Sequence, residues 1–320
     1  MAVPVFLAAL SGHIGLGLAA SVGGLMAIGA ETGTAPGERM GSLAALLAPA
    51  IAAAAIAALI AGHGWRTDAL LTLLAILAAV FGGYSRPLAV ATTRFVVFLV
   101  IAISVLETAP DRAVLAVLMI LGALWTMAVS LLLGALIGSG QNGPAIRPPA
   151  SSATAAQKFS RWKRNLTHLS GWQFALRLGL CLGIAGVLRW RWPDSHLIWI
   201  ALTVVLLSQR RLDIVPVKTT QRAVGTTLGV VAADLFTLHG LPVWGVVVTI
   251  GVLGAARPWL RSRNYLAYSA CMTPLIILIL DADGPITGGI LGDRLIATLI
   301  GVAMVIATNL AFARLVPKTA

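Results

Sequence analysis

The stretch Val114–Gly138, VLAVLMILGALWTMAVSLLLGALIG, contains no charged residue, and it decides which kind of fold this chain can adopt. A helix needs about 20 apolar residues to cross the hydrocarbon core of a bilayer, so this stretch predicts a transmembrane helix. Its apolar residues do not alternate with polar ones, as they would in a strand of a membrane barrel. Similar windows with few or no charges are Leu43–Ile60, Ala69–Gly83, Arg94–Val105 and Ile286–Ala311.

The composition extends this prediction to the whole chain. Hydrophobic residues make up 58% and charged residues 11% of the 320 positions, and the mean hydropathy is +0.93. A soluble domain needs more charge than this to cover its surface. Inside lipid, backbone N–H and C=O groups must be paired within the segment, which favours helices. We therefore predict an all-α protein, a polytopic bundle of transmembrane helices.

The spans fall into two groups, a first membrane repeat (1–138) and a second membrane repeat (171–320), with about eleven spans in all. In chain order we expect them at Phe6–Ile28, Arg39–Ala61, Thr67–Gly82, Leu88–Leu106, Ala113–Gly138, Trp172–Trp190, His196–Ser208, Thr219–Leu238, Pro242–Ala256, Asn264–Leu280 and Thr287–Leu315. Residues 139–170 are rich in Gly, Pro and Ser and then carry Lys158, Arg161, Lys163 and Arg164. They predict a cytoplasmic linker whose basic end lies at the membrane surface.

The charge distribution orients the bundle. The net charge is +12, but the basic residues gather in short loops between apolar spans, so nucleic acid is not the expected partner. With the linker inside, most Lys and Arg lie on the cytoplasmic side, while Asp68 and Glu107 lie outside with most other acidic residues. The positive-inside rule then places the N-terminus outside and the C-terminus in the cytoplasm.

Three landmarks recur in register and predict an internal duplication. They are His13, Arg39 and Asp111-Arg112 in the first half, and His196, Arg222 and Asp293-Arg294 in the second. We expect two parallel repeats of the kind seen in transporters. The second repeat begins with an extra helix, Trp172–Trp190, for which the first repeat offers no expected counterpart.

The strongest local pattern lies in the second repeat. It reads HLIWIALT at 196–203, Gln209 in a short polar loop, and QRAVGTTLG at 221–229. This pattern resembles the fusaric acid resistance family, also called aromatic acid exporters or the integral membrane bound transporter domain, to which plant aluminium-activated malate transporters are distantly related. The residues that carry the resemblance are Trp199, Thr203, Arg222, Gly225, Thr226 and Gly229. The first repeat keeps a degraded version, and this chain has only the linker where family members often carry a soluble domain.

The candidate functional residues lie at the start of two helices. Arg39 and Arg222 suit a carboxylate substrate because the planar guanidinium can bind both oxygens; the alternative is an anchor that reaches lipid phosphate. Thr226 is a further candidate substrate contact. Gly225 and Gly229 have a small-xxx-small spacing that predicts close helix packing.

Other polar residues have weaker assignments. Asp234, within an apolar run, is a candidate proton carrier or else a residue of the outer interface. His13 and His196 begin helices at the outer face, where they would sense pH or serve only as polar helix starts. We expect Arg177 to anchor to headgroups, and Trp162, Trp172, Trp190 and Trp192 to form an aromatic belt. The two Asp-Arg pairs are expected to be structural.

No enzyme motif is present in the sequence: we find no H-E-x-x-H, G-x-S-x-G, P-loop or Cys/His cluster, and we expect no catalytic residue, metal or cofactor. The prediction is a bacterial inner-membrane exporter of small organic carboxylates, aromatic ones above all, with membrane lipids as partners and a homodimer as an option. The alternatives left open are a channel-like anion conduit and a non-transporting membrane scaffold or assembly subunit.

Overall fold

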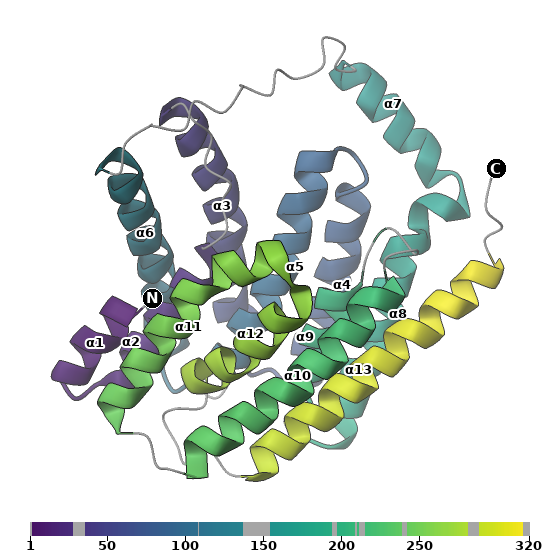
Figure 1. The fold of residues 1–320 in the computed structure, drawn as a ribbon. Helices are drawn as coiled ribbons and strands as arrows, with labels where there is room; N and C mark the ends of the chain where they lie inside the picture. Colours follow the sequence, from purple (N-terminus) through teal and green to yellow (C-terminus); the bar gives the residue numbers. More distant parts are fainter. Residues whose placement is uncertain are drawn as a thin grey trace.

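The computed structural model describes residues 2–27, 36–107, 109–136, 154–193, 197–208, 210, 215–238, 242–280 and 288–315. Over these residues the chain forms thirteen α-helices and no strand, which confirms the predicted all-α bundle (Figure 1). The helices are α1 (Ala2–Leu10), α2 (Ile14–Ala27), α3 (Pro36–Ile60), α4 (Trp65–Phe81), α5 (Arg86–Leu106), α6 (Arg112–Leu136), α7 (Ala155–Leu166), α8 (Leu169–Arg191), α9 (Ile198–Leu207), α10 (Val215–Leu238), α11 (Val243–Arg263), α12 (Tyr265–Leu280) and α13 (Gly288–Leu315).

Four segments of the described helices are long and apolar enough to cross a membrane. They are Arg86–Leu106, Arg112–Leu132, Gly171–Arg191 and Gly292–Arg314. Five further apolar helical segments are shorter: Ile14–Met26, Ala45–Ile60, Ile198–Leu207, Trp244–Arg257 and Tyr265–Ile279. Each coincides with one of the expected spans, so the chain is a multi-pass membrane protein of the predicted helical type.

The first expected span, Phe6–Ile28, is wrong as a single helix. It is two helices, α1 and α2, because Gly12 has a φ of 77°, a left-handed conformation that ends a helix. The backbone N–H of His13 donates to the carbonyl oxygen of Ala8 (2.9 Å), and the backbone N–H of Gly12 donates to the carbonyl oxygen of Ala9 (3.3 Å). These are the two hydrogen bonds of a Schellman motif, in which glycine after the last turn satisfies helix-end carbonyls.

Helix α7 lies inside the segment expected to be a linker. Its start is fixed by a capping box, in which Thr154 and Gln157 each accept the backbone N–H of the other. Trp162 Nε1 donates to the carbonyl of Val80 (3.0 Å), and its ring stacks on Phe81 with centroids 6.2 Å apart. Trp162 therefore docks α7 on the end of α4, whereas the sequence analysis had placed it in an aromatic belt.

The same helix pairings occur in the two halves of the chain. α2 packs on α6 as α9 packs on α13, α3 packs on α5 as α10 packs on α12, and α4 packs on α5 as α11 packs on α12. α8 packs on α4, and α1 packs on α11. The short helix α1 thus occupies the place of a counterpart to α8, which the sequence analysis did not expect. This recurrence supports the duplication, which stays a prediction.

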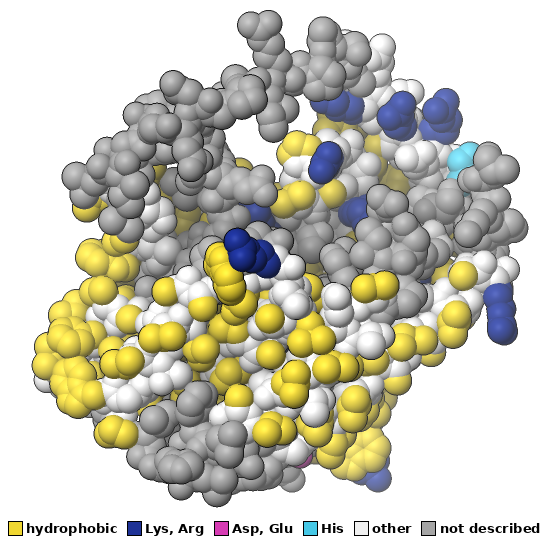
Figure 2. Space-filling view, viewed as in Figure 1, with side chains coloured by type: hydrophobic (Ala, Val, Ile, Leu, Met, Phe, Trp, Pro, Cys, Tyr) yellow, Lys and Arg dark blue, Asp and Glu magenta, His cyan; other side chains and the backbone are white. Residues whose placement is uncertain are grey.

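The core lies where the two halves meet. Its largest fully buried side chains include Leu99 and Ile103 of α5, Ile200 and Leu207 of α9, and Leu275 of α12. Many large apolar side chains are exposed instead, and Figure 2 shows them covering the lower part of the molecule. Lys and Arg side chains gather at the end that carries α7. An apolar face of this size is expected of a surface that contacts lipid rather than water.

Candidate functional site

A cavity of about 250 Å³ lies between the two halves of the chain. We call it the central pocket. Helices α2, α3 and α5 line it from the first half, and α9, α10, α11 and α12 line it from the second. Among the residues that the structure describes, the charged residues of its lining are Arg94, Arg222 and Arg257, and none is acidic. Its electrostatic character is therefore positive.

Arg222 is the most deeply buried of these three arginines. It is the eighth residue of α10, in the third turn, and is 6% exposed. Its Nε is buried without a hydrogen-bond partner among the residues that the structure describes. The hydroxyl of Ser269, from α12, donates to the backbone carbonyl of Arg222 (3.5 Å) and fixes this turn of α10. A buried N–H that lacks an acceptor costs free energy, which an anionic ligand in the pocket would recover.

Arg257 joins the two halves at the wall of the pocket. Its Nη1 donates to the carbonyl of Leu25 near the end of α2 (2.9 Å). Because Leu25 also lines the pocket, this hydrogen bond fixes α2 against α11 beside the cavity. Arg94 enters from α5, half-buried within a helix long and apolar enough to span a membrane. A charge at such a depth is expensive unless it faces a cavity or a partner.

Two tyrosines from the start of α12 add an aromatic surface. The rings of Tyr265 and Tyr268 stack with centroids 6.0 Å apart, and both line the pocket. The helix start is capped by Asn264, whose Oδ1 accepts the amides of Leu266 (2.9 Å) and Ala267 (3.2 Å). This capping satisfies the first free N–H groups of α12 and so fixes where the tyrosines lie.

The glycines of the RxxGTxxG pattern bring α10 against α12. A Cβ built on Gly225 would lie 2.6 Å from Ser269 Cβ and 2.7 Å from the carbonyl oxygen of Leu266. On Gly229, a Cβ would lie 2.6 Å from the carbonyl oxygen of Ala270. Thr226 is 1% exposed, and its Oγ1 has no hydrogen-bond partner among the described residues. Thr226 does not line the central pocket, and its role as a substrate contact stays a prediction.

Three of the residues singled out in the sequence have side chains outside the described part of the structure. The backbones of Arg39 and Asp234 lie in α3 and α10, and His196 falls in the gap before α9. Their roles stay predictions. Leu46, two turns beyond Arg39 on α3, lines the central pocket. α3 therefore contributes to the site even though the position of the Arg39 side chain is not described.

Sequence reasoning missed Arg94, Arg257, Tyr265 and Tyr268. Arg94 and Arg257 had served only as charges that orient the bundle. The signal for Arg94 was present, because an arginine in an otherwise apolar span should face a cavity. The tyrosines gave no such signal, since tyrosine at a span end is ordinary for the membrane interface.

Arg177 is also not where the sequence placed it. Instead of reaching lipid headgroups, it is 4% exposed and donates to the carbonyl of Gln173 (3.4 Å) and to Oδ1 of Asn309 on α13. The headgroup-anchor prediction for Arg177 was wrong, because a polar side chain on a neighbouring helix satisfies it inside the bundle.

Arg210 likewise turns inward from the loop after α9. It donates to the carbonyl of Ala79 (2.8 Å), and its guanidinium lies 4.7 Å from the ring centroid of Phe174. Burial lowers the pKa of this guanidinium from its ordinary value. Arg210 therefore ties the second half to the end of α4, beside the docked helix α7.

At the opposite end of the bundle, one arginine bridges two carboxylates. Arg189 Nε lies 3.0 Å from Asp68 Oδ2, and Arg189 Nη1 lies 2.6 Å from Glu107 Oε2. These ion pairs join α8 to α4 and to the end of α5. The sequence analysis had assigned Asp68 and Glu107 to the outer side, and the structure brings both to Arg189.

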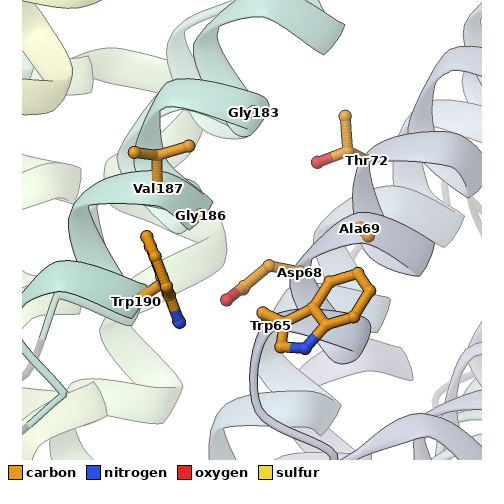
Figure 3. Close-up of a pocket in the computed structure, with 8 residues that line it drawn as sticks. All are labelled: Trp65, Asp68, Ala69, Thr72, Gly183, Gly186, Val187 and Trp190. Atoms are coloured by element: carbon orange, nitrogen blue, oxygen red, sulfur yellow. The ribbon is translucent and has the colours of Figure 1, made fainter.

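A second cavity, of about 510 Å³, lies beside this cluster between α4 and α8 (Figure 3). We call it the outer groove. Its walls are Trp65, Asp68, Ala69 and Thr72 on α4, and Gly183, Gly186, Val187 and Trp190 on α8. Among the residues that the structure describes, its one charged lining residue is Asp68, which Arg189 already neutralises. The outer groove is larger than the central pocket, but its described lining offers no charge complementary to an anion, so the central pocket is the candidate anion site.

Residues 179–308 match the family described as fusaric acid resistance protein-like. The match runs from within α8 to within α13 and includes Trp199, Arg222 and Tyr265, and it confirms the resemblance found in the second half of the sequence. The distant relation to plant malate transporters stays a prediction. No curated protein and no solved structure matches the chain. The family match indicates a membrane transport or resistance protein, which fits the expectation that the chain is not an enzyme.

Proposed function

From the premise that residues 179–308 form a fusaric acid resistance protein-like domain, we propose that this multi-pass membrane protein exports small organic anions and binds them in the central pocket. The observation that carries the proposal is the lining of that pocket. Among the described residues it contains Arg94, Arg222 and Arg257 and no acidic side chain, and Arg222 Nε is buried without a partner among them.

A carboxylate is the ligand that best satisfies this lining. Arginine presents a planar fork that binds both oxygens of a carboxylate, and such charge-assisted hydrogen bonds are roughly twice as strong as neutral ones. The three positive charges in the pocket repel one another, so an anion is stabilised there by Coulomb attraction as well as by hydrogen bonds. A cation would be repelled, and an uncharged solute would gain hydrogen bonds without the Coulomb attraction.

The apolar and aromatic lining favours an aromatic carboxylate. Tyr265, Tyr268 and Phe98 supply ring surfaces, and Met272 and Ile276 supply apolar contact. Aromatic pairs contribute about 0.5–1.5 kcal/mol beyond simple area burial. The volume of about 250 Å³ is below the roughly 300–1,000 Å³ of drug-sized ligand sites, which suits a small substrate.

The position of the pocket along its helices favours export from the cytoplasm. Arg222 lies near the start of α10, Arg257 near the end of α11, and Tyr265 at the start of α12. The charge rule places these three helix ends on the inside of the bacterial inner membrane, with the N-terminus outside and the C-terminus in the cytoplasm. Basic residues at that end would steer anions toward the pocket. A membrane potential that is negative inside favours anion exit by about 2.3 kcal/mol per charge at 100 mV.

Flux of radiolabelled benzoate in proteoliposomes tests the proposal. We expect saturable transport that uncharged benzamide does not inhibit. Arg222→Gln should lower transport per inserted molecule by roughly tenfold, because it removes a charge-assisted contact, and Arg222→Lys should recover only part of it. The matched control is Arg314→Gln, which removes an exposed arginine from the end of α13.

Further flux measurements distinguish an exporter of aromatic carboxylates from an anion channel and from a membrane scaffold. Tyr268→Leu should lower the preference for benzoate over acetate by roughly fivefold, because it removes a ring from the pocket. Flux that rises linearly with concentration would favour an anion channel. Absent flux together with a stoichiometric partner in the purified protein would favour a membrane scaffold. Unchanged flux in Arg222→Gln would exclude the central pocket as the anion site.

A further inference from the structure

Helix α7 leads almost directly into a segment that can cross the membrane. It ends at Leu166, and residues 167–170 separate it from the segment Gly171–Arg191 of α8. Trp172 Nε1, in the first turn of α8, donates to the carbonyl of Leu166 (2.9 Å) and holds the two helices together. Figure 1 shows α7 at the upper edge of the molecule, above α8. The helix therefore lies within a few residues of the point where the chain enters lipid.

The residues of α7 give the helix an apolar stripe with a lysine on each side. Four apolar residues spaced by three or four positions share one face of the helix: Ala155, Phe159, Trp162 and Leu166. Lys158 and Lys163 flank this stripe, because neighbouring residues lie about 100° apart around a helix. Arg161 and Arg164 lie farther round, on the opposite face, and α7 contains no acidic residue. This pattern is typical of helices that lie in the interface of a bilayer.

The bundle covers only part of the apolar stripe. Trp162 faces the bundle: its Nε1 donates to the carbonyl of Val80, and its ring stacks on Phe81. The ring of Tyr84 meets Trp162 edge-on, with centroids 6.4 Å apart. Phe159 contacts the ring of Trp162 but stays 54% exposed. Trp162 thus fixes the helix on the end of α4, and Phe159 leaves an apolar surface that lipid would cover.

The basic residues of α7 carry uncompensated charge. Arg161, Lys163 and Arg164 are exposed and Lys158 is half-buried, and none of them forms an ion pair with a residue that the structure describes. Residues 79–93, which include the docking site of α7, contain no acidic residue. Figure 2 shows Lys and Arg side chains gathered at this end of the molecule. A partner of complementary chemistry is therefore anionic and has an apolar part for Phe159.

We propose that α7 lies in the cytoplasmic surface of the membrane and binds anionic phospholipids, with its four basic residues at the phosphates and Phe159 among the acyl chains. Clusters of four or more Lys and Arg next to a transmembrane helix, or on an amphipathic helix, are attracted by the negative surface potential of anionic lipids. This lipid site is distinct from the anion site, because no described residue of α7 lines the central pocket.

A fluorescent label on α7 of the full chain tests the proposal. In a background without Cys181 and Cys271, Ala156→Cys places the environment-sensitive dye NBD at an exposed position one turn before Phe159. The protein is inserted in nanodiscs of phosphatidylcholine, alone or mixed with phosphatidylglycerol of identical acyl chains. We expect phosphatidylglycerol to shift the emission to shorter wavelength, because the label moves from water into the interface. Added salt should reverse the shift, because it screens exposed charges.

Two double variants separate a site on α7 from a general effect of positive charge. Lys163→Gln/Arg164→Gln should lower the apparent affinity for phosphatidylglycerol by tenfold or more, because each basic residue near the surface contributes about fivefold. The matched control, Arg263→Gln/Arg314→Gln, removes two exposed arginines from the ends of α11 and α13, on the side that the charge rule also places in the cytoplasm. The control should keep the shift.

Substitutions of Phe159 test whether α7 enters the apolar part of the membrane. Phe159→Ser should weaken the shift, whereas Phe159→Leu should keep most of it, because leucine retains an apolar side chain. Thermal melting of each variant shows that it is folded. Equal emission of the labelled chain in the two lipids would overturn the proposal. So would an equal loss in the two double variants, or an undiminished shift in Phe159→Ser.

Discussion

The guanidinium of Arg294 lies over the indole ring of Trp199, 3.7 Å from the ring centroid. This contact joins α13 to α9 inside the second half of the chain. Trp199 belongs to the pattern that carries the family resemblance, and Arg294 to the Asp-Arg landmark that recurs in both halves. Two signals that are separate in the sequence are thus one contact in the structure. The first half has an arginine at the matching place, Arg112, but no tryptophan in its degraded pattern.

This contact predicts a difference between two substitutions of Trp199. A desolvated cation–π contact contributes about 2 kcal/mol, and Trp199 and Arg294 are 5% and 3% exposed. Trp199→Phe keeps an aromatic ring for Arg294, although it removes the second ring of the indole and an N–H that has no hydrogen-bond partner among the described residues. Trp199→Leu removes the ring. We expect Trp199→Leu to lower the melting temperature in detergent clearly more than Trp199→Phe does; equal melting would show that the contact with Arg294 contributes nothing.

The packing of α10 on α12 predicts opposite effects of alanine at different glycines. At Gly225 a methyl group would meet Ser269 and the backbone of Leu266 at 2.6–2.7 Å, and overpacking of this kind typically costs about 1–3 kcal/mol. At Gly183 the space is open, so alanine should stabilise the helix by up to about 1 kcal/mol. Thermal unfolding of Gly225→Ala and Gly183→Ala measures both effects. A stable Gly225→Ala would mean that α10 and α12 are not closely packed.

The bridge formed by Arg189 predicts a loss of stability that depends on pH. Arg189→Gln would leave the carboxylates of Asp68 and Glu107 without their cation in a largely buried place, a change that costs about 3 kcal/mol or more when a buried pair is broken. Protonation of Asp68 as the pH falls from 8 to 5 removes the charge of that carboxylate. We therefore expect the loss to be smaller at pH 5 than at pH 8, as measured by melting of the variant and the unaltered chain in parallel. A loss equal at both pH values would contradict the electrostatic account.

The proposed orientation predicts where an impermeant thiol reagent reacts. In a background without Cys181 and Cys271, Ser160→Cys lies on the exposed surface of α7, on the side that the charge rule places in the cytoplasm. Asp283→Cys, between α12 and α13 in the chain, falls outside the described residues, and the charge rule predicts it on the external side of the membrane. Intact cells should therefore label only Asp283→Cys. Labelling of Ser160→Cys from outside would reverse the proposed orientation.

The sequence alone determined the class of fold, because only a few kinds of backbone structure are stable inside lipid. A run such as Val114–Gly138, without charge, must be buried in lipid or protein, and its backbone groups must pair within the segment. The family resemblance was also available, since Trp199, Arg222, Gly225 and Gly229 lie close together along the chain. Local signals also placed most helix ends within a few residues. The sequence did not predict the left-handed turn at Gly12, because glycine is common within apolar helices of membrane proteins.

Only the tertiary structure decided which residues share a site. The central pocket takes its arginines from α5, α10 and α11 and its tyrosines from α12, and their proximity depends on how seven helices from both halves pack. Arg177 and Arg222 look alike in the sequence, as single arginines near the start of apolar helices. One is satisfied by Asn309 of a neighbouring helix, and the other lines a pocket with its Nε unpaired among the described residues. The free energy of a buried charge depends on the groups within a few ångströms of it. Which groups lie there is determined by how the helices pack in the fold, and the order of residues along the chain does not reveal it.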